Sequence, residues 1–262
     1  MDIEKVLTDL READMVLVGL GEDFDDTGRL RSNEKYIAGK KYLQERTCYS
    51  FVPAWREYCS DKMADTLSPA LKKLEKLLDG KNYFVVSVAT DKRILQSVLN
   101  RERLVMPCGT TRYKQCGSGC PDMILELTEE DKASMAHFFD KLCDGQLSME
   151  DSPVLGSCPN CHAAMVLNNI YAENYDEQGY MPQWEKYTKW LQGTLNHKLA
   201  VLELGVGMQF PSVIRWPFEK AAYFNRKASF IRVHETLYQL TEELSGKGCG
   251  ISQNAIEWLE NL

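Results

Sequence analysis

The stretch Asp14-Met-Val-Leu-Val-Gly-Leu-Gly21 decides the fold of this chain, because it joins a short apolar run to two glycines. An apolar run of this length predicts a strand buried on both faces, and the glycines predict a tight turn after it. Similar runs follow at Tyr83–Ala89, Lys198–Gly207 and Ser229–His234. Helical patterns lie between them, so we predict an α/β fold: a Rossmann-like parallel sheet with helices on both faces.

The composition indicates a globular protein rather than a fibrous or disordered one. Of the 262 residues, 44% are hydrophobic and 26% are charged, which is ordinary for a folded domain. The apolar stretches are too short to span a bilayer and no signal peptide is visible, so we expect a cytoplasmic protein without a membrane partner. The net charge of −7 argues against nucleic acid as a partner.

Four of the nine cysteines form two close pairs, Cys116 with Cys120 and Cys158 with Cys161. Each pair lies on a short segment rich in glycine or in Pro-Asn, which allows both sulfurs to face one ion. Four thiolates from two such turns predict a structural Zn²⁺ site with no open position. His162 could replace one sulfur. The alternatives are unpaired core cysteines and a redox-active Cys-x-x-Cys pair.

The segment 113–166 interrupts the alternation of strands and helices and contains both cysteine pairs. We expect it to form a small zinc-ribbon/helical domain together with a helical insertion at 34–63. The remaining segments, 1–33, 64–112 and 167–262, are then expected to form a discontinuous nucleotide-binding domain.

This arrangement resembles the sirtuins, a family of NAD-dependent protein deacylases and ADP-ribosyltransferases, and is most similar to their macrodomain-linked branch. Ala13–Gly21 resembles the first strand and nucleotide loop of the family, and Tyr83–Asp91 resembles the strand leading to its Thr-x-Asn-x-Asp motif. The match specific to that branch is Leu204-Gly-Val-Gly-Met-Gln-Phe-Pro211, with Trp216–Phe218 beyond it. Lys247–Gly250 resembles the late loop that borders the adenine.

The resemblance implies an NAD-binding cleft and transfer of ADP-ribose to an acyl-lysine or to a protein side chain. Two residues are candidates for catalysis: Cys108, where the family has its catalytic histidine, and Asp91, the last carboxylate of the Thr-x-Asn-x-Asp motif. The candidate cofactor-binding residues are Gly19, Gly21, Gly109, Gly205, Gly207, Met208, His234 and Cys249. For His234, an ordinary position at the end of a strand is the alternative.

Three departures from the family pattern argue against fast catalysis. The ordinary pKa of a thiol, about 8.5, leaves Cys108 mostly protonated at neutral pH. Ala89 replaces the motif's asparagine, and a methyl group can hold neither a ribose nor a water molecule. Four carboxylates also follow Gly21, where a pyrophosphate would need backbone N–H groups. They belong to Glu22, Asp23, Asp25 and Asp26. The alternative is a solvated turn from which they point outward.

We therefore expect a sirtuin-like zinc protein that binds NAD or ADP-ribose, with weak or absent catalysis. One alternative is an active NAD-dependent protein ADP-ribosyltransferase or deacylase, a transferase of the macrodomain-linked type that acts on a protein acceptor. The other is a protein-interaction module whose nucleotide cleft is closed. The direction in which the carboxylates of the Glu22–Asp26 loop point separates these hypotheses.

Overall fold

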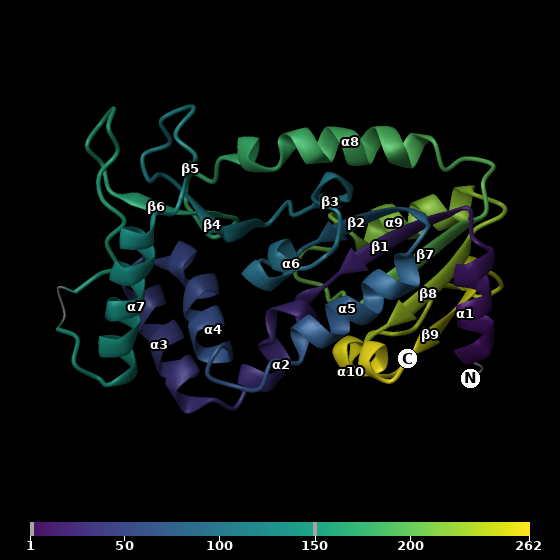
Figure 1. Ribbon diagram of the computed structural model, residues 1–262, viewed down its shortest axis with the longest axis horizontal. Coiled ribbons are helices and arrows are strands. Elements are labelled where there is room, and N and C mark those ends of the chain that lie inside the picture. The colour runs from purple at the N-terminus through teal and green to yellow at the C-terminus, as the bar shows by residue number, and fades with distance from the viewer. Residues whose placement is uncertain (1–2, 149–150) are drawn as a thin grey trace.

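The main sheet has six parallel strands in the order β3-β2-β1-β7-β8-β9 (Figure 1). The computed structural model describes residues 3–148 and 151–262. The strands are β1 (Met15–Leu20), β2 (Asn82–Ser87), β3 (Leu104–Val105), β7 (Leu199–Leu204), β8 (Ser229–Val233) and β9 (Gly248–Ile251). This is the strand order of a dinucleotide-binding sheet, and the order reverses between β1 and β7. The predicted α/β fold with a parallel sheet is confirmed.

Helices cover both faces of this sheet, which explains the uninterrupted apolar runs. Along β1, Val16 and Val18 face one helical layer, while Met15 and Leu17 face the other, because successive strand residues point to opposite faces. The first layer consists of α1 (Ile3–Glu12), α5 (Leu67–Leu78) and α10 (Ala255–Glu260). The second consists of α8 (Met181–Gln192) and α9 (Arg215–Phe224), and Figure 1 shows the two layers on opposite sides of the strands.

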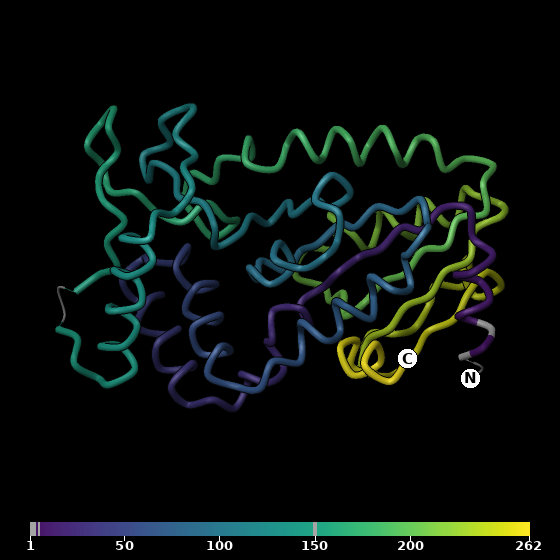
Figure 2. Tube along the Cα trace, viewed as in Figure 1, coloured from purple at the N-terminus to yellow at the C-terminus, as the bar shows by residue number. Residues whose placement is uncertain are grey.

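A second unit lies at the far end of the molecule from the two termini (Figure 2). Its antiparallel sheet has the order β5-β4-β6, with β4 (Gly109–Cys116), β5 (Leu125–Glu126) and β6 (Met165–Asn169). Three helices pack beside it: α3 (Glu34–Glu45), α4 (Val52–Ser60) and α7 (Glu129–Cys143). Trp55 of α4 lies 5.3 Å from Tyr58 and 5.5 Å from Phe139 of α7, measured between ring centroids. Segments distant in sequence therefore share one hydrophobic core; the division into two domains stays a prediction.

The connecting elements are short. They are η1 (Glu22–Asp25), α2 (Thr27–Leu30), η2 (Tyr49–Phe51), α6 (Lys92–Gln96), η3 (Arg101–Arg103), η4 (Glu177–Gly179) and η5 (Glu242–Leu244). The late loop expected around Lys247–Gly250 is largely the edge strand β9, which pairs with β8. Within the described part of the chain, no helix is long and apolar enough to cross a membrane.

Gly21, at the turn after β1, packs directly against the backbone of the loop after β7. A Cβ atom at Gly21 would lie 2.0 Å from the carbonyl oxygen of Gly205. We therefore expect Gly21→Ala to lower the free energy of unfolding by about 2 kcal/mol or more, because the two loops must move apart. Urea unfolding measures this change. The control is Gly28→Ala, where nothing lies within 4 Å of the added atom; an equal loss of stability in both variants would contradict the explanation.

Candidate functional site

The carboxyl ends of β1, β2 and β7 meet where the strand order reverses, which is the usual ligand site of an open parallel sheet. The loops that leave these strands are in close contact. The N–H of Gly21 donates to the carbonyl of Leu204 at 2.8 Å, and that of Gly205 donates to Val233 at 2.8 Å. Gly205 has a φ of +61°, and a Cβ atom there would lie 2.4 Å from the Cβ of Asp23. Glycine is therefore required where these two loops meet.

The carboxylate of Glu22 occupies backbone donors of the loop that follows β7. Its Oε2 accepts a hydrogen bond from the N–H of Gly207 at 2.6 Å, and its Oε1 accepts one from Gln209 at 3.3 Å. Asp23 behaves similarly, because its Oδ2 accepts from the N–H of Ala255 at 3.1 Å. Both carboxylates thus bind N–H groups that would otherwise be available to an anion.

Asp25 forms a buried ion pair with Arg56 of α4. Its Oδ1 lies 2.6 Å from Arg56 Nη2, and the two side chains are 7% and 6% exposed. The same oxygen accepts the N–H of Thr90 at 2.9 Å, and Arg56 also donates to the Thr90 hydroxyl. Burial raises the pKa of Asp25 to about 6, although Arg56 opposes this shift. The second unit thereby places a cation beside the end of β2.

Asp26 and Asp91 share the guanidinium of Arg93. Arg93 Nη2 lies 2.9 Å from Asp26 and 2.6 Å from Asp91, and Asp26 also accepts a hydrogen bond from Ser60 of α4. Asp91 is the N-cap of α6 and accepts the N–H of Arg93 at 2.8 Å. Its carboxylate is therefore committed to a helix cap and an ion pair. The expected alternative of a solvated acidic turn is wrong, because Asp25 and Asp26 are buried and paired.

Cys108 and Ala89, the other two positions compared with the family's motifs, offer no ionised group. Cys108 is 2% exposed, and burial, with the nearby charges of Asp25 and Glu22, raises the pKa of its thiol far above its usual value. The thiol is consequently neutral at physiological pH. Ala89 is fully buried. The structure thus shows no general base at Cys108 or at Ala89.

The predicted cofactor-binding residues fall into two groups. Gly21, Gly205 and Gly207 lie together at the cleft with Glu22 and Asp23, as the contacts above show. The other five predicted residues have different surroundings. The roles of these residues in cofactor binding stay predictions.

Gly19 lies inside β1 under α9, where a Cβ atom would come 2.6 Å from Ile214. Gly109 begins β4 with a φ of +79°, and Met208 is exposed. His234 follows β8, and its Nδ1 accepts the N–H groups of Thr236 and Leu237, as expected of a histidine at the end of a strand. Cys249 lies in β9.

The four predicted zinc ligands converge on one point of the second unit. The sulfurs of Cys116, Cys120, Cys158 and Cys161 all lie within 4.8 Å of one another, and those of Cys116 and Cys161 are 3.5 Å apart. Tetrahedral zinc with bonds near 2.3 Å would place its sulfurs about 3.8 Å apart. A backbone N–H from Cys120 lowers the pKa of the Cys116 thiol, which favours the thiolate. Among the described residues, this group contains no histidine, so His162 lies outside it.

Three residues that matter here were not singled out from the sequence: Arg56, Glu57 and Arg93. A charged residue in an amphipathic helix is ordinarily solvated, so nothing local marked them. Glu57 is buried beside Arg56 in α4; its Oε1 accepts from the Thr111 hydroxyl at 2.6 Å and from the N–H of Lys92 at 2.9 Å. Burial, and then the charge of Asp91, raise the pKa of Glu57 to about 8.

Comparison with known proteins places this geometry in a known fold. No family model matches the chain. The structure described as "Sir2-p53 peptide-NAD+" has a TM-score of 0.58 at 12% identity, covering 100% of this chain and 97% of that chain. A Sir2 homolog–NAD complex has a TM-score of 0.57 at 13% identity, covering 100% of this chain and 92% of that chain. The chain therefore has the sirtuin fold, which confirms the resemblance found in the sequence.

Two curated relatives are similar in sequence. A protein ADP-ribosyltransferase of Staphylococcus aureus is 17% identical over 270 residues, covering 96% of this chain and 84% of that protein. A probable bifunctional ADP-ribose hydrolase/ADP-ribosyltransferase of Fusarium oxysporum is 28% identical over 143 residues, covering 53% of this chain and 23% of that protein. The second match thus spans about a quarter of its relative.

The raised pKa of Glu57 predicts that the protein loses stability as the pH rises. The pKa of glutamate in an unfolded chain is about 4.3, so between that value and about 8 the folded protein holds the proton more tightly. The free energy of unfolding should then fall by up to about 1.4 kcal/mol per pH unit in this window. Urea unfolding at pH 6, 7 and 8 measures the slope.

Glu57→Gln removes this titration while keeping an oxygen for Thr111 and Lys92, so its unfolding should depend less on pH. The control is Glu130→Gln, at an exposed position of α7. Parallel pH curves for Glu57→Gln and the control would show that Glu57 does not titrate in this range.

The cysteine cluster predicts a protein that holds one zinc ion and needs it for stability. Cys158→Ser should lose most of the bound metal and lower the melting temperature by several degrees, because a structural zinc contributes directly to folding. Metal analysis and thermal unfolding test this. Cys143→Ser is the control, since Cys143 lies outside the cluster; zinc retained in Cys158→Ser would argue against the site.

Proposed function

We propose that this chain is a nucleotide-binding protein of the sirtuin fold, with weak or absent transferase chemistry, in which its own carboxylates compete with the nucleotide for backbone N–H groups. NAD or ADP-ribose is its ligand, and a protein is its second partner. The observation that carries the proposal is the carboxylate of Glu22 on the N–H groups of Gly207 and Gln209.

This contact opposes a pyrophosphate in two ways. A phosphate bound at the end of a parallel strand needs free backbone N–H groups, and Glu22 already occupies two of them. A phosphate that binds beside Glu22 also meets its negative charge, which costs about 3 kcal/mol for two unit charges ~5 Å apart at an effective dielectric of 20. Tight binding of NAD therefore requires the Glu22 side chain to move away from the N–H groups of Gly207 and Gln209.

The surroundings of Cys108 and Asp91 support slow chemistry. A general base must hold its proton weakly enough to take part near neutral pH. The buried Cys108 thiol keeps its proton, and the Asp91 carboxylate is paired with Arg93. With Ala89 in place of the motif's asparagine, the described residues supply no general base at these three positions.

An active transferase is the second candidate, because both curated relatives are named as ADP-ribosyltransferases. Under this hypothesis the protein would release nicotinamide from NAD in the presence of a protein acceptor, at a rate far above that of spontaneous hydrolysis.

Calorimetric titration with NAD and with ADP-ribose tests this competition. Glu22→Ala should bind ADP-ribose at least tenfold more tightly than the unaltered protein, a gain of about 1.4 kcal/mol, because it frees two N–H groups and removes one charge. Glu22→Gln removes only the charge, so its affinity for ADP-ribose should lie between those of Glu22→Ala and the unaltered protein. Glu130→Gln, with the same change of charge far from the cleft, should bind like the unaltered protein.

Two outcomes would contradict the proposal. Equal micromolar affinity in the unaltered protein and in Glu22→Ala would show that the Glu22 carboxylate does not compete with the nucleotide. No binding to any variant at millimolar nucleotide would exclude nucleotide binding and favour an interaction module. Rapid release of nicotinamide by the unaltered protein would establish the second candidate instead.

A further inference from the structure

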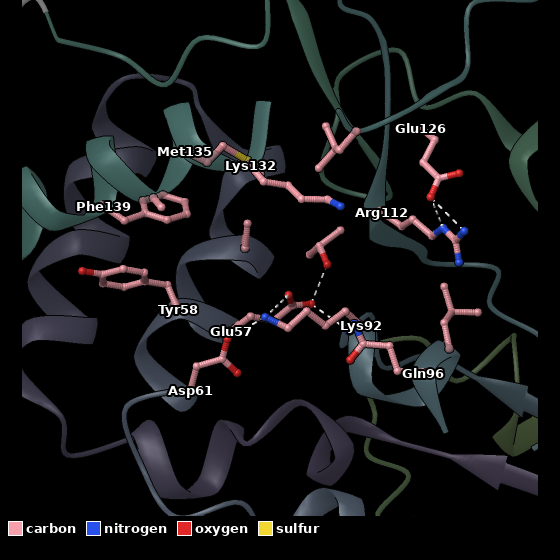
Figure 3. Close-up of a pocket in the computed structure, with 15 residues that line it drawn as sticks. Glu57, Tyr58, Asp61, Lys92, Gln96, Arg112, Glu126, Lys132, Met135 and Phe139 are labelled. Atoms are coloured by element: carbon pink, nitrogen blue, oxygen red, sulfur yellow. Dashed lines mark hydrogen bonds and ion pairs between the residues drawn. The ribbon is translucent and has the colours of Figure 1, made fainter. Parts of the chain in front are cut away.

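A hollow lies between α4, α6 and α7 and beside β4 and β5 (Figure 3). Its volume is about 370 Å³, within the range of pockets that bind small organic ligands. It lies where the second unit meets the main sheet, because α6 follows β2 while α4 and α7 belong to the second unit. None of the cofactor or zinc residues discussed above lines it.

One side of this hollow, called the α4–α6–α7 cavity below, is apolar. Met135 and Phe139 lie one turn apart on α7, so both side chains point the same way, and Figure 3 shows them together on one side. Leu95 of α6 and Ala54 of α4 extend the apolar lining. Such walls accommodate an aromatic ring or a branched aliphatic group.

The carboxyl group of Glu57 supplies a hydrogen-bond donor within the cavity. Its Oε1 already accepts two hydrogen bonds, from Thr111 and from the N–H of Lys92, whereas its Oε2 has only the Lys92 ammonium at 3.9 Å. A buried carboxyl of this kind is protonated at neutral pH and can donate from Oε2 to a ligand oxygen.

Charge decides which kind of ligand fits. With Glu57 neutral, the lining has three cations against two ionised carboxylates; the cations are Lys92, Arg112 and Lys132, and the carboxylates are Asp61 and Glu126. Each cation has a partially or fully exposed acidic partner, at 2.5 Å from Lys92, 2.8 Å from Arg112 and 2.6 Å from Lys132. Exposed ion pairs contribute little stability, so a ligand anion can replace one of these partners.

We propose that the α4–α6–α7 cavity binds a small carboxylic acid with an aromatic or branched aliphatic body. The ligand carboxylate lies between the Lys92 ammonium and the Glu57 carboxyl, and the body packs on Met135 and Phe139. The site is independent of the nucleotide cleft, and its ligand bridges α6 and α7.

The groups near Glu57 define how binding depends on pH. Lys92 and Asp91 lie at the start of α6, Asp61 one turn along α4, Arg112 on β4 and Lys132 on α7. The pKa of Glu57, raised by burial to about 8, lies between pH 7 and pH 9, so Glu57 changes its charge over this range. Its ionisation removes the donor and adds a negative charge, so affinity for a carboxylate falls about tenfold over this range.

NMR titration of protein labelled at its methionine methyl groups tests this proposal, with Met135 as the reporter. The probes are phenylacetate, benzyl alcohol and benzylamine, which share a ring and differ in the head group. Phenylacetate should shift the Met135 signal saturably and bind at least tenfold more tightly than the other two. Its affinity should fall about tenfold from pH 7 to pH 9, and by at least fivefold in Lys92→Gln.

Ala136→Trp provides a variant that fills the cavity without disturbing the core, because Ala136 lines the cavity from an exposed position of α7. It should abolish the shift of Met135. Ala133→Trp, on an exposed position of the same helix outside the cavity, should bind phenylacetate normally. Tighter binding of benzylamine, unchanged affinity in Ala136→Trp, or no saturable shift with any probe would overturn the proposal, whatever NAD does at the cleft.

Discussion

The ion pair between Asp25 and Arg56 is the interaction on which the position of the turn after β1 depends. It joins the turn after β1 to α4, and both side chains are almost wholly buried. Removing one partner of such a pair leaves an uncompensated buried charge, which typically costs 3–5 kcal/mol, so the two units are held together at this point. The N–H of Thr90 binds the same carboxylate, which adds the end of β2 to the junction.

This junction explains how four carboxylates fit into one short turn. Asp25 and Asp26 have the guanidinium groups of Arg56 and Arg93, while Glu22 and Asp23 have only neutral backbone donors. The arginines fix the turn, and the turn then directs Glu22 toward the loop after β7. The residues that hold the turn therefore differ from those that meet a nucleotide, and Glu22 can change without removing a buried ion pair.

The sequence predicted those features that depend on local pattern. Short apolar runs identified β1, β2, β7 and β8, because a buried parallel strand needs no alternation, and the runs of β1 and β7 also end in glycine. The cysteine spacing identified the cluster, since two short turns suffice to bring four sulfurs together. The direction of the acidic side chains was not predictable in this way, because it depends on arginines from α4 and α6 that the fold brings to the turn.

The helix α6 lies between the two sites and presents a different residue to each. Asp91 and Arg93 face the turn after β1, whereas Lys92 lines the α4–α6–α7 cavity. An anion in the cavity would attract the Lys92 ammonium, which moves on a flexible four-carbon chain, and this motion leaves the pairs of Arg93 intact. The backbone N–H of Lys92, however, is bound by Glu57. Two routes therefore connect the cavity with the turn after β1: this hydrogen bond to the start of α6, and α4, which lines the cavity and carries Arg56 and Ser60.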